Sequence, residues 1–180
     1  MIYRFKIISE ETANFRREIE IDPDAYFMEL RDAILDSVDY SKDEINSFYI
    51  CDDDWRRLDE VAIEDFGTLS DRDLYLMDET RLSELIEDEG QKIEFVFDGL
   101  TERSFFMELK EIITGKNISE PLCCLKEGKA PAQHVDIDDF EKKIEKKAAD
   151  LSRELDMDFY GDSEFDADEL DDRFVDLESM

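Results

Sequence analysis

Residues 2–21 read IYRFKIISEETANFRREIEI, and apolar and polar side chains alternate on either side of a short polar segment. A period of two is typical of a strand with one buried face. The polar residues 9–14 separate two such segments, so the pattern predicts a β-hairpin formed by residues 2–8 and 15–21. A two-stranded hairpin is marginal on its own, and we therefore expect the rest of the domain to cover its apolar face.

Helical spacing follows directly after the hairpin. Asp22 and Pro23 suit an N-cap and a first helical position. The apolar residues that come next recur at intervals of three and four: Phe27, Leu30, Ile34 and Val38. This spacing predicts an amphipathic helix of about four turns that packs across the hairpin.

The chain then returns to strand-like patterns. We expect a strand over residues 45–51, a turn at 52–54, a short helix near Leu82 that ends before Gly90, and a second hairpin over residues 93–109. Residues 59–77 follow no single period. The order of elements predicts an α+β fold, with a β-grasp-like mixed sheet and one long helix across it, over residues 1–114.

Three further segments follow this domain. Residues 115–136 contain two of the three prolines and show almost no periodicity, which predicts a long surface loop. Residues 137–155 carry an apolar stripe at helical spacing and are expected to form a C-terminal helix. From Glu154 to Met180 there are twelve acids and one base, so like-charge repulsion predicts a solvated, mobile acidic tail over residues 156–180.

Charge limits the classes of partner. The 180 residues contain 52 Asp and Glu against 22 Lys and Arg, a formal net charge of −30. A surface this negative attracts basic protein patches and repels phosphate backbones and anionic lipids. There is no signal-peptide pattern and no run of about 20 apolar residues. We expect a cytoplasmic protein whose partner is a basic protein rather than nucleic acid or a membrane, and nothing in the pattern predicts an oligomeric state.

The sequence shows no assembled set of catalytic residues. His134 is the single histidine, and Cys123 and Cys124 are the nucleophiles with which it could pair. A general base must be held beside its nucleophile, whereas His134 lies in the predicted loop. The acidic run at residues 52–54 is typical of a solvated turn. We therefore expect no catalytic residues, no cofactor and no metal site, and an enzyme is the less favoured hypothesis.

The candidate interaction residues are aromatic. Trp55 stands beside Arg56 and could be either an exposed anchor or a core residue. Other aromatic side chains interrupt the acids of the tail, namely Phe159, Tyr160, Phe165 and Phe174. Acidic segments of this kind fold on a basic partner or simply keep a protein soluble, and both alternatives stay open.

Two segments resemble the plasmid pRiA4b ORF-3-like family. Residues 78–98 are similar to the family pattern of a Leu-rich turn, an acidic residue before Gly90 and an aromatic strand. Residues 121–131 are similar to its Cys- and Pro-containing loop. The family's Tyr-Asp-Phe-Gly-Asp-x-Trp box is reduced here to the four residues 97–100. The resemblance covers about residues 2–131 and implies the fold more than a function.

These observations favour a non-enzymatic cytoplasmic protein-interaction module that engages a basic partner through its acidic surface or tail. Two alternatives stay open. One is a hydrolase that uses carboxylates or a metal ion, since the acids are so abundant. The other, which follows from the family resemblance, is an accessory protein of a plasmid or mobile element.

Overall fold

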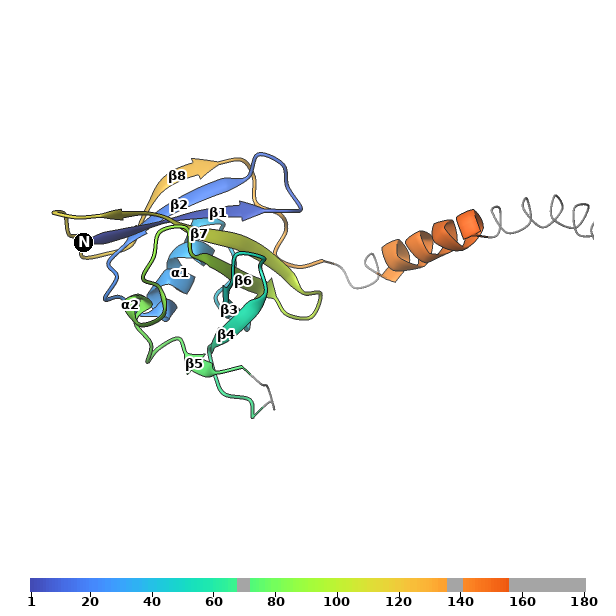
Figure 1. Cartoon of the computed structure of the whole chain (residues 1–180). Helices are drawn as coiled ribbons and strands as arrows, with labels where there is room; N and C mark the ends of the chain where they lie inside the picture. The colour runs from blue at the N-terminus through green and yellow to red at the C-terminus, as the bar shows by residue number, and fades with distance from the viewer. Residues whose placement is uncertain (68–71, 136–140, 156–180) are drawn as a thin grey trace, which may run out of the picture. The chain divides into compact units, whose positions relative to one another are not determined.

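The computed structural model describes residues 1–67, 72–135 and 141–155. Its two units are residues 1–134 and the chain from residue 135 onward, and each is described by itself. The first unit is an α+β domain built on a sheet of eight strands (Figure 1). The elements are β1 (Ile2–Ser9), β2 (Arg16–Ile21), α1 (Phe27–Ser37), β3 (Ser47–Cys51), β4 (Arg57–Ala62), β5 (Leu74–Leu76), α2 (Leu82–Leu85), β6 (Lys92–Asp98), β7 (Arg103–Ile113) and β8 (Leu122–Glu127).

The strands follow the order β5-β4-β3-β6-β7-β1-β2-β8. The predicted hairpin forms, because β1 and β2 pair antiparallel with Phe5 opposite Ile19. β1 also pairs antiparallel with β7, which places Ile2 opposite Ile113. β4 and β5 run parallel, so the sheet is mixed. The α+β class and the mixed sheet are therefore confirmed, and the N-terminal strand lies inside the sheet rather than at its edge.

The core lies between α1 and one face of the sheet (Figure 1). Phe27 of α1 contacts Phe48 of β3, with ring centroids 5.4 Å apart. Burying an aromatic side chain contributes about 1.5–3 kcal/mol relative to leaving it exposed, so aromatic packing supplies much of the stability of this domain. The fully buried phenylalanines are Phe5, Phe27, Phe48, Phe95, Phe97 and Phe105.

The helix α1 begins later than its sequence pattern predicts. The Asp22 carboxylate accepts a hydrogen bond from Asp24 N–H at 2.8 Å, so the Asp22-Pro23 pair forms a turn before the helix. The helix is capped instead by Glu29, whose carboxylate accepts from Tyr26 N–H at 2.8 Å. α1 spans 11 residues, about three turns rather than four. The predicted N-cap at Asp22 is wrong because that carboxylate serves a local turn.

The edge strand β8 lies inside the segment that we expected to be a loop. It pairs antiparallel with β2, with Arg16 opposite Glu127, and its side chains are mostly exposed. An edge strand of this kind is held by backbone hydrogen bonds and not by burial of an apolar face. The stretch Leu122-Cys123-Cys124-Leu125 therefore lacks the alternation from which strands are predicted, and the loop prediction is wrong for residues 122–127.

The other strand predictions agree with the structure. β3 occupies most of the predicted segment 45–51, and β6 and β7 form the second hairpin. Residues 59–77, which follow no single period, contain the end of β4 and the three-residue strand β5. Gly90 has the expected positive φ of 87°, although α2 already ends at Leu85.

The face of the sheet opposite α1 carries charged cross-strand contacts. Arg57 of β4 donates two hydrogen bonds to the Glu94 carboxylate of β6, at 2.9 and 3.0 Å, and Ser104 of β7 donates a third at 2.9 Å. Burial raises the pKa of Glu94, but the hydrogen bonds from Arg57 and Ser104 outweigh it, and the pKa ends below its ordinary value of 4.5. The ionised form of Glu94 therefore stabilises the fold.

This contact predicts a pH-dependent effect of Glu94→Gln. A carboxylate whose folded pKa is depressed contributes stability above its unfolded pKa, and that contribution is lost as pH falls through the folded value. We expect the variant to lose about 1–2 kcal/mol of unfolding free energy at pH 7, since a hydrogen bond to a charged group is broken. The difference from the wild type should shrink as the pH falls below 4.5.

Urea unfolding followed across pH 3–7 measures this difference, because it gives the unfolding free energy of each protein at each pH. The matched control is Glu10→Gln, which removes an exposed carboxylate from the β1–β2 turn. A surface change of this kind is expected to stay within about 0.5 kcal/mol. A difference between Glu94→Gln and the wild type that does not vary with pH would contradict the assignment.

The second unit contributes one described element. Residues 141–155 of the predicted helix 137–155 are helical. Across the part of the chain that the structure describes, no helix has the length and apolar character needed to cross a membrane.

Candidate functional site

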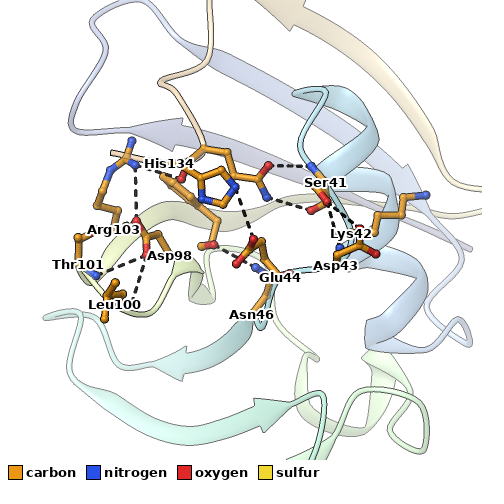
Figure 2. A network of polar contacts seen from close by, with 12 residues as sticks. Ser41, Lys42, Asp43, Glu44, Asn46, Asp98, Leu100, Thr101, Arg103 and His134 are labelled. Atoms are coloured by element: carbon orange, nitrogen blue, oxygen red, sulfur yellow. Dashed lines mark hydrogen bonds and ion pairs between the residues drawn. The ribbon is translucent and has the colours of Figure 1, made fainter. Parts of the chain in front are cut away.

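A polar network holds the loop that follows α1 (Figure 2). The Gln133 side chain pairs with both backbone groups of Ser41, accepting from Ser41 N–H at 2.7 Å and donating to Ser41 O at 2.9 Å. Arg103 of β7 donates to Gln133 O at 3.2 Å and lies 3.7 Å from the Asp98 carboxylate. Loop residues 41–46 are thereby fixed against the β6–β7 turn.

A buried arginine joins α1 to the same loop. Arg31 donates from Nε to Asn46 Oδ1 at 2.8 Å and from Nη2 to Glu44 O at 3.2 Å. Asn46, which is 1% exposed, donates in turn to Phe97 O at 3.1 Å. Buried polar groups that are all paired rigidify the structure around them. These hydrogen bonds hold α1, the loop that follows it and the end of β6 in a fixed arrangement.

Two grooves flank α1 on its solvent side. One, of about 290 Å³, lies between α1 and residues 120–121. The other, of about 270 Å³, lies between Arg31, loop residues 42–45 and residues 63–66. Lys42 lines the second groove and reaches Asp36 of the first at 2.9 Å, so the two grooves adjoin. We call the carboxylates that line them the α1 acidic face: Glu29, Asp32, Asp36, Asp43, Glu44, Glu64 and Glu120.

Three of these carboxylates come from α1 itself. Glu29, Asp32 and Asp36 are three and four residues apart, which places them on one side of a helix. Two cations also line the grooves, and both are already paired: Arg31 lies 3.0 Å from Asp32, and Lys42 contacts Asp36. The hydrogen bond from Lys42 to Asp36 raises the pKa of the lysine. Negative charge is thus in clear excess over the whole face.

The C-terminal end of α1 carries acidic residues, although basic residues would stabilise the helix better there. The last turn contains Asp36 and no basic residue, and Asp39 lies two residues beyond the end of the helix. A carboxylate there faces the partial negative charge of the helix dipole, at a cost of about 0.3–1 kcal/mol. This placement adds to the negative charge of the α1 acidic face.

Apolar side chains accompany the carboxylates. Ile45 and Phe66, both in the second groove, are 60% and 57% exposed. Exposed apolar residues rimmed by charge are typical of protein-binding surfaces. The arrangement can accept a segment that presents basic side chains together with one or two apolar ones.

Trp55 lies on the other face of the sheet. Its ring packs edge-on against Phe106 with centroids 4.9 Å apart, and Lys92 Nζ lies 5.2 Å from its centre. The side chain is half-buried and is outside the main hydrophobic core. It is therefore neither a core residue nor a neighbour of the α1 acidic face, and its predicted role in binding stays a prediction. The tail residues Phe159, Tyr160, Phe165 and Phe174 lie outside the described residues.

The structure does not bring His134 to the cysteines. His134 Nε2 lies 3.5 Å from Glu44, which is an ion pair when the imidazole is protonated (Figure 2). Cys123 Sγ contacts Leu125 O and Cys124 Sγ contacts Glu18 O. Both thiols therefore lie against backbone carbonyl oxygens of β2 and β8. Burial raises the pKa of Cys124, which keeps that thiol protonated near neutral pH.

The other thiol and the acidic turn have local structural roles. Burial raises the pKa of Cys51 to about 11, so this thiol is not a nucleophile at neutral pH. Asp52 accepts hydrogen bonds from Asp54 N–H and Arg56 N–H, each at 2.9 Å, and thereby closes the β3–β4 turn. No group of three or more His, Cys, Asp or Glu side chains that could hold a metal ion occurs among residues 1–67, 72–135 and 141–155.

Fold and site together define the class of this protein: a small α+β domain in which a three-turn helix crosses an open mixed sheet and presents a grooved acidic surface. The chain belongs to the plasmid pRiA4b ORF-3-like protein family, whose sequence pattern matches residues 1–173. The resemblance seen in the sequence is thereby confirmed.

A solved structure has a similar fold. It is the crystal structure of a protein of unknown function, MM3350, from Methanosarcina mazei Go1. The two chains share 16% sequence identity at a TM-score of 0.54, and the likeness covers 69% of this chain and 68% of that one. At this identity the likeness concerns the fold alone. A search of curated proteins found no significant match.

Proposed function

We propose that this protein is a non-enzymatic cytoplasmic interaction module that binds a basic segment of another protein on its α1 acidic face. The observation that carries the proposal is the pair of adjoining grooves, in which seven carboxylates meet two cations that are already paired. Complementary charge speeds encounter with a basic partner and suppresses acidic ones. Exposed Ile45 and Phe66 supply the apolar contacts on which affinity depends.

The proposal includes a secondary role for the acidic tail. Its aromatic residues Phe159, Tyr160, Phe165 and Phe174 interrupt a run of acids, a composition that suits folding on a basic surface. The family description names a plasmid reading frame, which supports a plasmid or mobile element as the setting. The order of β1, β2 and α1 supports a β-grasp-like arrangement, which we also retain as a proposal. The hydrolase alternative stays a prediction.

Neutralising the α1 acidic face is expected to weaken binding of a basic peptide. The variant is Asp32→Asn, Asp36→Asn and Glu120→Gln, and the probe is a labelled peptide of Lys, Arg and Leu. We expect the dissociation constant to rise by about tenfold, because three favourable charge contacts are lost, and to rise with added salt in the wild type. Fluorescence anisotropy measures both effects.

The matched control changes the net charge by the same amount elsewhere. Asp53→Asn, Asp54→Asn and Glu10→Gln remove three exposed carboxylates from turns that lie outside the grooves. The control should shift the dissociation constant by less than about threefold if the grooves are the site. Equal weakening by both variants would mean that only net charge matters, and loss only on removal of residues 154–180 would place the site in the tail.

A further inference from the structure

A cleft at the C-terminal end of α1 has more positive than negative side chains, unlike the chain as a whole. It measures about 580 Å³ and lies between the C-terminal end of α1, Arg17 of β2, and residues 126–133. Its charged residues are Arg17, Lys126 and Lys129 against a single acid, Asp39. In the whole chain acids outnumber bases by 52 to 22, so the lining of this cleft departs from the average charge of the protein.

Arg17 is the buried centre of the cleft. The side chain is 3% exposed, and its hydrogen-bond partners are backbone carbonyl oxygens: Ser37 O at 3.2 Å, Glu127 O at 2.6 Å, Gly128 O at 3.1 Å and Arg16 O at 3.0 Å. A guanidinium has five N–H groups, so these contacts leave one to spare. No carboxylate forms an ion pair with Arg17 among the described residues, and its guanidinium lies over the Phe15 ring, 4.6 Å from the centroid.

Burial of the Arg17 guanidinium disfavours its charged form. Burial lowers the pKa of Arg17, with Cys123 and Asp39 only partly opposing the effect. An arginine nevertheless stays charged in proteins. The carbonyl of Ser37 belongs to the end of α1, and the helix dipole offsets about half a unit of charge there. The structural role of Arg17, which fastens β8 to α1, explains its carbonyl contacts but not the lack of a counter-ion.

Two lysines add positive charge to the cleft beside Arg17. Lys126 and Lys129 line the cleft, and within the described part of the chain neither forms an ion pair. Two lysines beside a buried guanidinium make the local potential of the cleft positive. Val38, Tyr40 and Pro131 supply apolar walls.

We propose that this cationic cleft binds a small phosphorylated organic anion. A phosphate dianion matches the excess of cations, and lysines bind it well as point charges. The volume lies in the range of about 300–1,000 Å³ that is usual for small-molecule sites, and the apolar walls leave room for an organic body. A long polyanion would be repelled by the acidic surface around the cleft. A small ligand would not, because at physiological salt charges farther away than about 8 Å are largely screened.

The site shares no residue with the α1 acidic face, so the two proposals fail independently. Isothermal titration calorimetry with phenyl phosphate and with inorganic phosphate distinguishes an organic phosphate from the free ion. We expect saturable binding of phenyl phosphate at concentrations up to about 1 mM, tighter than that of inorganic phosphate. Amide NMR shifts should locate the binding at residues 126–133 and at Arg17.

The decisive variant is Lys126→Gln with Lys129→Gln, because both side chains are exposed and the fold should tolerate their replacement. We expect phenyl phosphate affinity to fall by about tenfold or more. The matched control, Lys6→Gln with Lys92→Gln, removes two positive charges from elsewhere on the sheet and should leave affinity within about twofold. Equal loss in both pairs, tighter binding of inorganic phosphate, or no saturable binding to the wild type would overturn the proposal.

Discussion

Phe105→Ala is expected to cost about 3–5 kcal/mol of unfolding free energy, the usual loss for a fully buried Phe. Phe105 is 0% exposed and contacts three other rings: Phe97 at 4.6 Å, Phe15 at 5.2 Å and Tyr40 at 5.9 Å between centroids. Removing it opens a cavity that these neighbours cannot fill by small shifts. Because domains of this size are stable by only about 5–15 kcal/mol, the variant should be close to unfolding at physiological temperature.

The next residue along the same strand is the control. Phe106 points to the opposite face of the sheet, where it is half-buried and contacts Trp55. Phe106→Ala removes an aromatic contact and a smaller buried area, and we expect a loss of about 1 kcal/mol. Urea unfolding of both variants measures the contrast. Similar losses for the two would mean that α1 does not cover the face that carries Phe105.

Gly128→Ala is the second substitution with a large expected effect. Gly128 has a φ of 70°, and an added Cβ would lie 2.4 Å from Asn14 O and 3.0 Å from Phe15 Cα. The left-handed conformation alone costs a non-glycine residue about 1–2 kcal/mol. The contact is with backbone that cannot rotate away, so we expect a total loss of about 2–4 kcal/mol and separation of the end of β8 from the β1–β2 turn.

Gly115→Ala separates these two contributions. Gly115 also has a positive φ, 77°, but an added Cβ would meet nothing within 4 Å. Its replacement should therefore cost only the conformational part, about 1–2 kcal/mol. Urea unfolding measures the totals, and hydrogen exchange at the amides of β8 shows where the damage lies. If both variants lose the same free energy, the close approach of Gly128 to Asn14 is wrong.

The part of the fold that could be predicted is the part in which burial controls the sequence. Alternation in β1 and β7 follows from one buried face, and the residues expected to point inward, such as Phe5 and Met107, are buried. The strand β8 could not be predicted in this way, because exposed positions leave no periodic trace. The start of α1 was misplaced because Asp22 satisfies a turn just as well as it would cap a helix.

The candidate sites were harder to predict, because they depend on contacts between distant segments. Seven acids scattered from residue 29 to residue 120 become one face only after folding. One signal was available for Arg17. It stands between Phe15 and Ile19, at a position where the period of two points inward, so a charged residue there could have marked a special site. Arg31 likewise follows the buried Leu30 on the inner side of α1.

The pairing of β1 with β7 has a consequence for how the chain is made. β1 pairs with β2 early, but Ile2 also lies opposite Ile113, so the other edge of β1 lacks its partner β7 until about a hundred further residues have been added. At a synthesis rate of about 5–20 residues per second, this edge of the β1–β2 hairpin stays unpaired for several seconds or longer. Such long-range pairing also slows refolding of the finished chain. Strong mutual repulsion among nascent copies would help to keep them apart during that interval.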